Sequence, residues 1–347
     1  MRLGIIARSD NTGLGNQTME LVKMLNPDKI LLINSSFFNE NQQHPEWYKD
    51  YNATQTTHGM PTIREIRTFL ENLDVVISCE TFYHLEFVSI AKERGVKTIL
   101  QYNYELFGNL AHPEWPLPDV LLAPSIWNLD VVIEKFGKKS KVVHLPPPTD
   151  YSLFSEAKEI NLSKDHKRIL HIGGKKAAKD RNGTDSIFEM VKYSKEDYEI
   201  VIKSQTRFDS LCKDPRVKIE IGNPNNRQDM YKGFDAMVLP RRYAGLCLPM
   251  NEALMSGIPV FMTDISPNNA ILPPEWLAES NKIDKFKAKS FVDVYEANPQ
   301  KLAKIIDDYV INNEKIKSKN NAYQIGLENF SVESLKQKYL NLIISIL

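Results

Sequence analysis

Residues that commonly bind hydroxyl and anionic groups interrupt an otherwise apolar segment in the last third of the chain. The segment reads PRRYAGLCLPMNEALMSGIPVFMTD (240–264). A buried core uses its leucine, methionine and valine side chains, but it does not need Arg241, Arg242, Asn251 or Glu252. A carboxylate can accept hydrogen bonds from two neighbouring hydroxyls, and arginine favours anions such as phosphate. These residue types indicate a ligand that carries both kinds of group.

The elements around these residues place them at one end of a sheet. The run DAMVLP (235–240) predicts a strand, RRYAGLC the loop after it, and PMNEALMS (249–256) a helix with Pro249 at its first position. Gly257 ends that helix, and IPVFMT (258–263) predicts the next strand. In open α/β sheets, ligands bind at the carboxyl ends of strands and close to helix N-termini.

We therefore expect a nucleotide sugar here, with its diphosphate at the helix start and its ribose hydroxyls on Glu252 in the first helical turn. The alternative for Glu252 is an acid that only stabilises the helix dipole. Further donor-binding candidates in this segment are Arg242, Tyr243, Gly245, Leu246 and Asn251.

The succession of strand, glycine loop and helix occurs at the start of each half of the chain. The first copy is RLGIIA (2–7), RSDNTGLGN (8–16) and QTMELVKML (17–25). The second is RILHIG (168–173), GKKAAKDRNG (174–183) and TDSIFEMVKY (184–193), with Thr184 or Asp185 as the helix cap. This unit opens a doubly wound α/β domain, so the sequence predicts two such domains.

Short apolar runs in both halves predict parallel strands buried on both faces. The proline-rich segment VVHLPPPTDYSLF (142–154) predicts a stiff connection between the domains. The predicted strands are 29–34, 74–79, 97–102, 119–124, 198–204, 217–222, 235–240 and 258–263.

Composition excludes several classes of protein. The 347 residues are enough for two domains, and 44 basic residues balance 44 acidic ones, which argues against a long-range electrostatic hold on nucleic acid. Cys79, Cys212 and Cys247 have no metal or redox spacing and are interpreted as reduced thiols. The polar turn after MRLGIIA and the lack of a long apolar run predict no signal peptide and no integral membrane segment. We therefore expect a cytoplasmic protein.

The spacing of Gly-x-x-x-Pro-x-x-Glu-Ala-x-x-x-Gly-x-Pro-Val resembles the donor-binding signature of GT-B glycosyltransferases, especially the retaining enzymes of glycosyltransferase family 4. Other segments extend the resemblance over most of the chain: GLGNQTMELVKML, PSIWNLDVVIEKFG, HIGGKKAAKDRNG and FSVESLKQKYLNLI. The opening Pro-Arg-Arg-Tyr is similar to glycosyltransferases encoded by bacteriophages. The matching residues are Gly245, Pro249, Glu252, Ala253, Gly257, Pro259 and Val260.

The resemblance implies an α/β protein of the GT-B fold, with two doubly wound Rossmann-like domains facing a cleft. Residues 1–148 would form the acceptor-side domain, 149–329 the nucleotide-sugar domain, and 330–347 a helix crossing back to the first. The implied activity is that of a hexosyl- or pentosyltransferase. It would use an NDP-sugar, with a UDP-sugar favoured, retain the anomeric configuration, and require no cofactor and no metal.

The sequence departs from the family pattern at one position. Many members have two glutamates, of which Glu252 matches the second, but Ala244 stands where the first would be. The family places that first glutamate near the transferred sugar, so the identity of the sugar stays open.

Cations after the second glycine loop are candidates for stabilising the leaving diphosphate. Lys179 and Arg181 are assigned catalytic roles because negative charge develops on the diphosphate as the glycosidic bond breaks. Gly173, Gly174 and Lys175 are expected to bind the donor there, and Lys203 is a weaker candidate. Each of these lysines is equally typical of a solvated loop.

Two further groups lie at strand ends of the first half. Gly13 and Gly15 allow a close backbone approach to donor sugar or phosphate, or only a tight turn. After the strand at 97–102, Tyr102 and Asn103 are acceptor-side candidates and Glu105 a catalytic one.

The acceptor and oligomeric state stay open. The acceptor is a hydroxyl of a glycan or small molecule, or of a modified base in DNA, in which case the basic stretches 135–141 and 164–181 would line the DNA path. Two alternatives compete with a transferase: a sugar-nucleotide epimerase of similar architecture and a non-catalytic sugar-nucleotide-binding protein.

Overall fold

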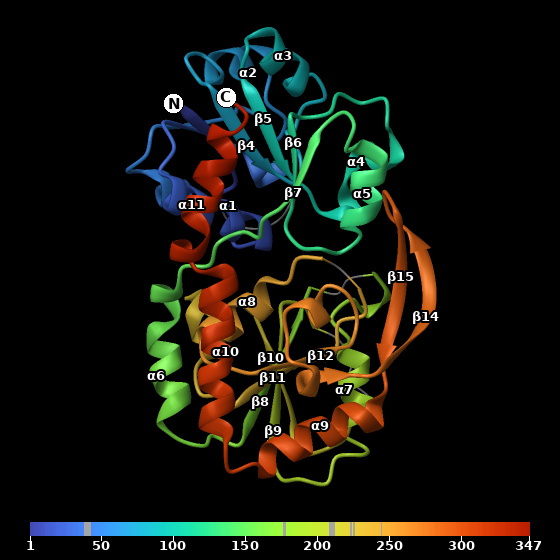
Figure 1. Ribbon diagram of the computed structural model, residues 1–347. Helices are drawn as coiled ribbons and strands as arrows, with labels where there is room; N and C mark the ends of the chain where they lie inside the picture. Colours follow the sequence, from blue (N-terminus) through green and yellow to red (C-terminus); the bar gives the residue numbers. More distant parts are fainter. Residues whose placement is uncertain (38–42, 176–177, 208–211, 223, 225, 244) are drawn as a thin grey trace. The chain divides into compact units, whose positions relative to one another are not determined.

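The computed structural model describes residues 1–347 except 38–42, 176–177, 208–211, 223, 225 and 244, and within them the chain divides into two units (Figure 1). Unit 1 comprises Met1–Pro148, Ala288–Ser290 and Val332–Leu347. Unit 2 comprises Thr149–Lys287 and Phe291–Ser331. Ala244 lies outside the described residues, so the structure does not describe the place of the family's first glutamate.

Unit 1 is built on a seven-stranded parallel sheet with the order β3-β2-β1-β4-β5-β6-β7. Its central strand β1 (Leu3–Ala7) is buried throughout and pairs with β2 (Lys29–Leu32) on one side and β4 (Val75–Cys79) on the other. Its continuous apolar sequence suits a strand covered on both faces. The remaining strands are β3 (Ala53–Gln55), β5 (Lys97–Gln101), β6 (Val120–Ala123) and β7 (Lys141–His144).

Helices complete unit 1, and the C-terminal one packs into its core. Leu335, Tyr339, Leu342 and Ile343 of α11 (Val332–Ile344) belong to the same apolar cluster as β1. The Tyr339 hydroxyl lies 3.0 Å from the amide nitrogen of Gln101, which connects α11 to β5. The other helices are α1 (Gly13–Leu25), α2 (Ile63–Phe69), α3 (Phe87–Glu93), α4 (Gly108–Ala111) and α5 (Leu129–Phe136), and the short 3-10 turns are η1 (Ser35–Phe37), η2 (Pro45–Tyr48) and η3 (Tyr104–Leu106).

Two predicted boundaries in unit 1 differ from those of the structure. The predicted connection at 142–154 begins within strand β7, because Val142 and Val143 extend the sheet beside β6 before the prolines end it. The predicted loop at 8–16 ends early, since α1 starts at Gly13 with Thr12 as its cap. The Thr12 hydroxyl accepts a hydrogen bond from the Gly15 amide at 3.1 Å.

Unit 2 contains a second parallel sheet, with the order β10-β9-β8-β11-β12-β13. Its strands are β8 (Arg168–Gly174), β9 (Glu199–Ser204), β10 (Val217–Ile221), β11 (Ala236–Leu239), β12 (Val260–Thr263) and β13 (Leu277–Ala278). The sequence predicted all of these except β13, as it predicted the strands of unit 1 except β3 and β7. The predicted doubly wound α/β class is confirmed in both units.

The helices of unit 2 are α6 (Ser155–Ser163), α7 (Thr184–Met190), α8 (Leu248–Met255), α9 (Pro299–Ile311) and α10 (Lys315–Phe330). An antiparallel hairpin of β14 (Ser280–Lys287) and β15 (Phe291–Ala297) follows β13, and the sequence reading missed it. Short turns lie at η4 (Tyr151–Phe154), η5 (Ala178–Asp180), η6 (Arg227–Tyr231), η7 (Asn268–Ala270) and η8 (Pro274–Trp276).

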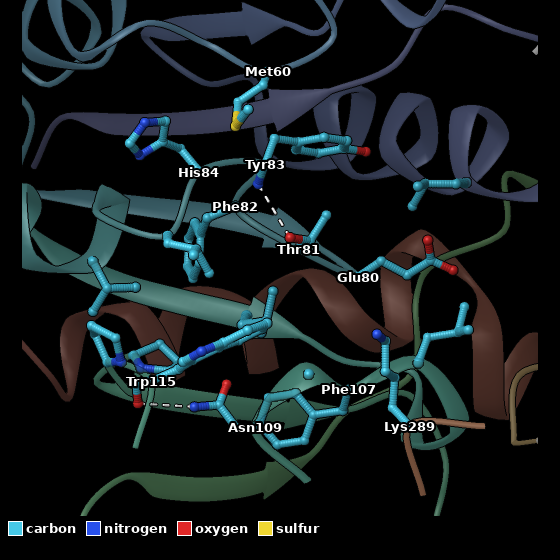
Figure 2. A pocket seen from close by; sticks show the side chains of 18 of the residues that line it. Met60, Glu80, Thr81, Phe82, Tyr83, His84, Phe107, Asn109, Trp115 and Lys289 are labelled. Carbon is cyan, nitrogen blue, oxygen red and sulfur yellow. Dashed lines mark hydrogen bonds between the residues drawn. The ribbon is translucent and has the colours of Figure 1, made fainter. Parts of the chain in front are cut away.

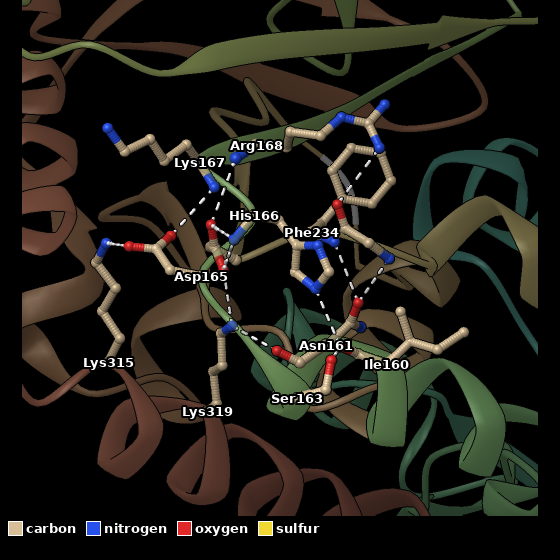
Figure 3. A network of polar contacts seen from close by, with 12 residues as sticks. Ile160, Asn161, Ser163, Asp165, His166, Lys167, Arg168, Phe234, Lys315 and Lys319 are labelled. Carbon is tan, nitrogen blue, oxygen red and sulfur yellow. Dashed lines mark hydrogen bonds and ion pairs between the residues drawn. The ribbon is translucent and has the colours of Figure 1, made fainter.

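A buried ion pair connects α10 to the sheet of unit 2 (Figure 3). Lys319 and Asp235 are almost fully buried, and their charged atoms lie 2.7 Å apart. The Lys319 ammonium also donates to the carbonyl of Asn161 on α6 at 2.6 Å. The Asp235 carboxylate accepts from the backbone amide of His166 at 3.0 Å, just before β8. The pair therefore joins α6, α10 and the amino-terminal ends of β8 and β11.

Candidate functional site

The strand order of unit 2 reverses between β8 and β11, and most of the predicted donor residues follow these two strands. Such a reversal leaves a crevice at the carboxyl ends of the strands, where ligands of doubly wound sheets bind. The loop after β11 lies against the loop after β8, since the amide of Arg242 donates to the carbonyl of Arg181 at 2.9 Å.

Gly183 allows this close contact. It has a φ of +73°, and a Cβ atom at this position would lie 2.1 Å from the carbonyl oxygen of Pro240. Gly183 is also the residue that caps α7, so the predicted cap at Thr184 or Asp185 is wrong. The Thr184 hydroxyl instead lies 3.0 Å from the ring of His171 on β8.

Glu252 lies in a buried polar cluster with two residues of η6. Its side chain is 7% exposed, and one carboxylate oxygen accepts from Arg227 Nε at 2.8 Å and from the other guanidinium nitrogen at 2.7 Å. The second oxygen accepts from the Tyr231 hydroxyl at 2.5 Å. Burial and the adjacent Glu252 carboxylate raise the pKa of Tyr231 well above its usual value, so this hydroxyl remains a donor.

The structure corrects the position of Glu252 within its helix. The helix α8 begins at Leu248, which makes Pro249 its second residue and Glu252 its fifth, beyond the first turn. A carboxylate has about four acceptor positions, and Arg227 and Tyr231 occupy three of them. Among the residues that the structure describes, these contacts leave one acceptor position on the second oxygen, whereas binding of both ribose hydroxyls by Glu252 would need two.

The arginines of the opening segment are held within unit 2. Arg241 is buried and donates to the carbonyl of Leu246 at 2.8 Å, which shapes the loop before α8. Arg242 donates to Glu296 of β15 at 2.6 Å. Tyr243 is buried edge-on against Phe286 of β14, with 5.1 Å between ring centroids. Arg242 and Tyr243 therefore anchor the β14–β15 hairpin, and this contact explains them without a ligand.

The glycine-loop residues lie at the carboxyl end of β8. Gly173 and Gly174 are the last residues of the strand, and their backbone is held by Asn182, whose amide donates to the Gly173 carbonyl at 3.1 Å. Lys175 follows and is exposed. The Lys179 ammonium lies 2.7 Å from Asp284, with both side chains substantially exposed. Such an exposed pair is weak and leaves the cation accessible to an anionic ligand.

The side chain of Lys203 lies away from the glycine-loop residues. Its ammonium lies 3.7 Å from Glu220 on β10 and 5.3 Å from the centre of the Phe234 ring. Phe234 precedes β11, so the side chain reaches back toward the amino-terminal end of the sheet. Burial lowers the pKa of Lys203 from its usual value.

The remaining donor candidates surround the start of α8. Gly245 and Leu246 are half-buried in the loop before it. Asn251 is 1% exposed, and its amide nitrogen has no hydrogen-bond partner among the residues that the structure describes. These residues lie on the same helix and loop as Glu252.

His171 connects the strands and the helix that carry the site. It is fully buried on β8, with one ring nitrogen 2.9 Å from the carbonyl oxygen of Val238 on β11 and the other 3.0 Å from the Thr184 hydroxyl. Burial lowers its pKa from 6.5 to about 4, because a charged imidazolium loses its hydration there. His171 therefore holds β8, β11 and α7 together in its neutral form.

Acidification should destabilise the protein through His171. The unfolded chain binds a proton near pH 6.5 and the folded chain only near pH 4, so stability is complete above pH 6.5 and is lost as the pH falls toward 4. Urea unfolding at pH 7 and pH 5 should show a loss about 2 kcal/mol larger for the wild type than for His171→Gln. Equal losses in the two proteins would contradict this assignment.

In unit 1 the strand order reverses between β1 and β4. Arg8 and Asp10 follow β1 as a buried ion pair, with Arg8 Nε 2.9 Å from the Asp10 carboxylate. Burial alone would raise the pKa of Asp10, but hydrogen bonds from Thr12 and Arg8 hold it below its usual value. Gly13 begins α1, and a Cβ atom on Gly15 would lie 1.9 Å from the Asp10 carbonyl oxygen. Packing thus accounts for Gly15 without a ligand.

The side chains of the predicted acceptor-side residues have different surroundings in the structure. Tyr102 is 1% exposed and packs against Phe107 in the core, with 5.1 Å between ring centroids. Asn103 donates to the Glu80 carboxylate at 2.8 Å. Glu105 lies in η3, and one of its oxygens is buried without a hydrogen-bond partner in the described structure.

A cavity of about 610 Å³ opens in unit 1 beside the reversal of strand order (Figure 2). Met60 and Tyr83 lie on one side of it, and Trp115 and Phe107 on the other. Arg8 and Glu80, which follow β1 and β4, also belong to its lining. Glu80 supplies a carboxylate to the lining of this cavity, and Glu105, the predicted catalytic residue, does not belong to the lining.

Sequence reasoning missed Arg227, Tyr231, Glu80 and the aromatic side chains of the cavity. Glu80 follows a predicted strand, so the rule that located Tyr102 and Asn103 also applied to it. Arg227 and Tyr231 lie in a short turn without a recognisable motif, and only the tertiary structure brings them to Glu252.

No family model matches the chain, and no curated protein matches it in sequence. Solved structures match over nearly its whole length. HepE of Anabaena in complex with UDP and glucose has a TM-score of 0.69 at 11% identity, covering 99% of this chain and 100% of that chain. A glycosyltransferase of Rickettsia africae ESF-5 has a TM-score of 0.68 at 12% identity, covering 99% and 98%. Sucrose-phosphate synthase of Thermosynechococcus elongatus has a TM-score of 0.65 at 10% identity, covering 100% and 99%.

These similarities show the fold. The chain has the GT-B fold, made of two Rossmann-like domains that each contain a parallel sheet, as the sequence resemblance implied. In the part of the chain that the structure describes, no helix is long and apolar enough to span a membrane. The same residues contain no cluster of three or more His, Cys, Asp or Glu side chains suited to a metal ion.

Proposed function

We propose that the protein is a glycosyltransferase that moves a sugar from an NDP-sugar, with UDP-sugars favoured, to an acceptor hydroxyl. Of the similar structures, one is a glycosyltransferase and another a sucrose-phosphate synthase, and HepE was solved with UDP-glucose. The observation that carries the proposal is the position of Glu252, held by Arg227 and Tyr231 on the helix that follows the crevice between β8 and β11.

In this proposal, unit 2 binds the nucleotide. One ribose hydroxyl donates to the open acceptor position of Glu252, and the diphosphate lies between the loop after β8 and the start of α8. Gly173, Gly174 and Gly245 allow close approach of the backbone, and Lys175, Lys179 and Arg181 supply positive charge. Lys203, Arg242 and Tyr243 support the surrounding structure and do not contact the donor.

The reaction proceeds by attack of the acceptor oxygen on the anomeric carbon. The bond from that carbon to the diphosphate breaks, and the hydroxyl proton passes to the departing phosphate oxygen. Lys179 and Arg181 stabilise the negative charge that develops there. The resemblance to family 4 supports attack from the face that the diphosphate leaves, and hence retention, and NMR of the product anomer would test it.

DNA is not favoured as an acceptor by the distribution of charge. Residues 164–181 span both ends of β8, whose seven residues extend over about 20 Å. At the amino-terminal end, Arg168 is paired with Glu199 at 3.0 Å. Lys175, Lys179 and Arg181 lie at the opposite end, so these cations do not form one continuous path. We therefore propose a smaller acceptor.

A nucleotide panel tests the donor site. UDP, GDP, ADP and their common sugars should be compared by thermal shift, since a ligand that binds only the folded state raises the melting temperature. One UDP-sugar should stabilise the protein and release UDP when an acceptor is added. Interconversion of two NDP-sugars without release would identify the epimerase alternative, and tight binding without turnover would identify a binding protein.

A further inference from the structure

We infer that the cavity of unit 1 binds the apolar ring system of an aromatic alcohol, which serves as the acceptor. The role of this ligand as the acceptor rests on the proposed transferase function, but the chemistry of the ligand follows from the cavity itself. Its volume of about 610 Å³ is that of a site for a small organic molecule.

The position of the cavity is that of a ligand site. Arg8 follows β1 and Glu80 follows β4, and these neighbouring strands flank the reversal of strand order in unit 1. The loop after β4 is held in a costly conformation, with φ values of +64° at Glu80 and +62° at Tyr83. Non-glycine residues with such backbone angles concentrate at functional sites.

The lining favours an apolar, ring-containing ligand. Four aromatic side chains surround the space, namely those of Phe82, Tyr83, Phe107 and Trp115. Flat rings pack against aromatic side chains with an attraction beyond that of burial alone. Three further lining residues, Met60, Leu85 and Leu106, are 58%, 60% and 49% exposed, and exposed apolar side chains gathered around one cavity are typical of ligand-binding sites.

Several polar groups of the lining form hydrogen bonds within the protein, which leaves fewer of them for a sugar. Asn109 donates to the carbonyl of Trp115 at 3.0 Å, as Figure 2 shows. Thr81 accepts from the amide of Tyr83 at 3.2 Å, and His84 accepts from the amide of Glu86 at 3.1 Å. A sugar ring needs several convergent polar partners, whereas an aromatic alcohol needs one for its hydroxyl. Glu80 has the carboxylate that can accept this hydroxyl proton in a hydrogen bond.

Fluorescence titration with 4-methylumbelliferone, a flat aromatic alcohol, tests the inference in the absence of any donor. The wild type should bind the probe saturably, and Leu85→Glu and Met60→Glu should each weaken binding about 10-fold or more by placing a charge against the rings. The matched control is Ile133→Glu, which changes a 48% exposed side chain of α5 outside the lining and should leave binding unchanged.

The outcomes separate this inference from the proposed function. Equal binding to all four proteins, or tighter binding of methyl glucoside or octyl glucoside than of the probe, would overturn the aromatic assignment. A UDP-sugar thermal shift without probe binding would leave the transferase proposal standing and remove the inference. Probe binding that responds to Leu85→Glu without any nucleotide-sugar shift would support the cavity assignment and count against the transferase proposal.

Discussion

Replacing Glu252 by alanine should abolish the thermal shift produced by the nucleotide sugar and weaken UDP binding about 30-fold. A hydrogen bond between a ribose hydroxyl and a carboxylate contributes about 2 kcal/mol, which corresponds to that factor. The variant should also melt at a lower temperature without ligand, because Arg227 and Tyr231 lose their partner. The shift caused by the ligand must therefore be measured against each variant's own baseline.

Two further variants separate a binding role of Glu252 from a structural one. Glu252→Gln keeps an acceptor for Arg227 and should recover most of the stability, but it lacks the negative charge and should not recover the full affinity. Glu199→Ala removes the partner of Arg168 at the amino-terminal end of β9 and should lower stability without changing UDP binding. If Glu252→Ala bound UDP with the affinity of the wild type, Glu252 would have only a structural role.

Replacing Lys319 by methionine should lower the free energy of unfolding of unit 2 by about 3–5 kcal/mol. The substitution keeps the apolar stem but leaves the Asp235 charge buried without its partner, and an unpaired buried charge is costly. The carbonyl of Asn161 also loses its donor. Urea unfolding followed by a spectroscopic probe in unit 2 measures the change.

The double variant Lys319→Met/Asp235→Asn should lose much less stability, because no buried charge remains. An exposed ion pair supplies the control: Lys304 and Asp308 lie 2.6 Å apart on α9 with side chains 69% and 59% exposed, and Lys304→Met should cost less than about 0.5 kcal/mol. Similar losses for Lys319→Met and Lys304→Met would show that the buried pair does not hold unit 2 together.

Helix ends and edge strands were harder to predict than central strands. The strands β1, β4, β8 and β11 are buried on both faces, and their continuous apolar sequences predict this burial. Strands β3 and β13 have only three and two residues, too short for a recognisable pattern. Strand β7 was not predicted because the prolines that follow it indicate a loop. The β14–β15 hairpin is polar and lacks the apolar pattern of the buried strands.

For the candidate site, the sequence predicted the location but not the contacts of the individual side chains. The spacing from Gly245 to Val260 was sufficient to predict a ligand site at the carboxyl ends of β8 and β11, because helix and strand signals locate loops without any tertiary information. Spacing did not show what each side chain contacts. Arg242, Tyr243 and Lys203 have the right types for a ligand, yet in the structure they pair with Glu296, Phe286 and Glu220.

Local periodicity and turn residues were enough to predict the two-domain α/β architecture and the end of the second sheet at which Glu252 lies. The contacts of Arg227 and Tyr231 with Glu252, and the aromatic cavity beside β1 and β4, became visible only in the folded chain. Those contacts join residues from separate loops, and their formation depends on how the sheets twist and how the helices pack, which the local pattern of residues does not encode.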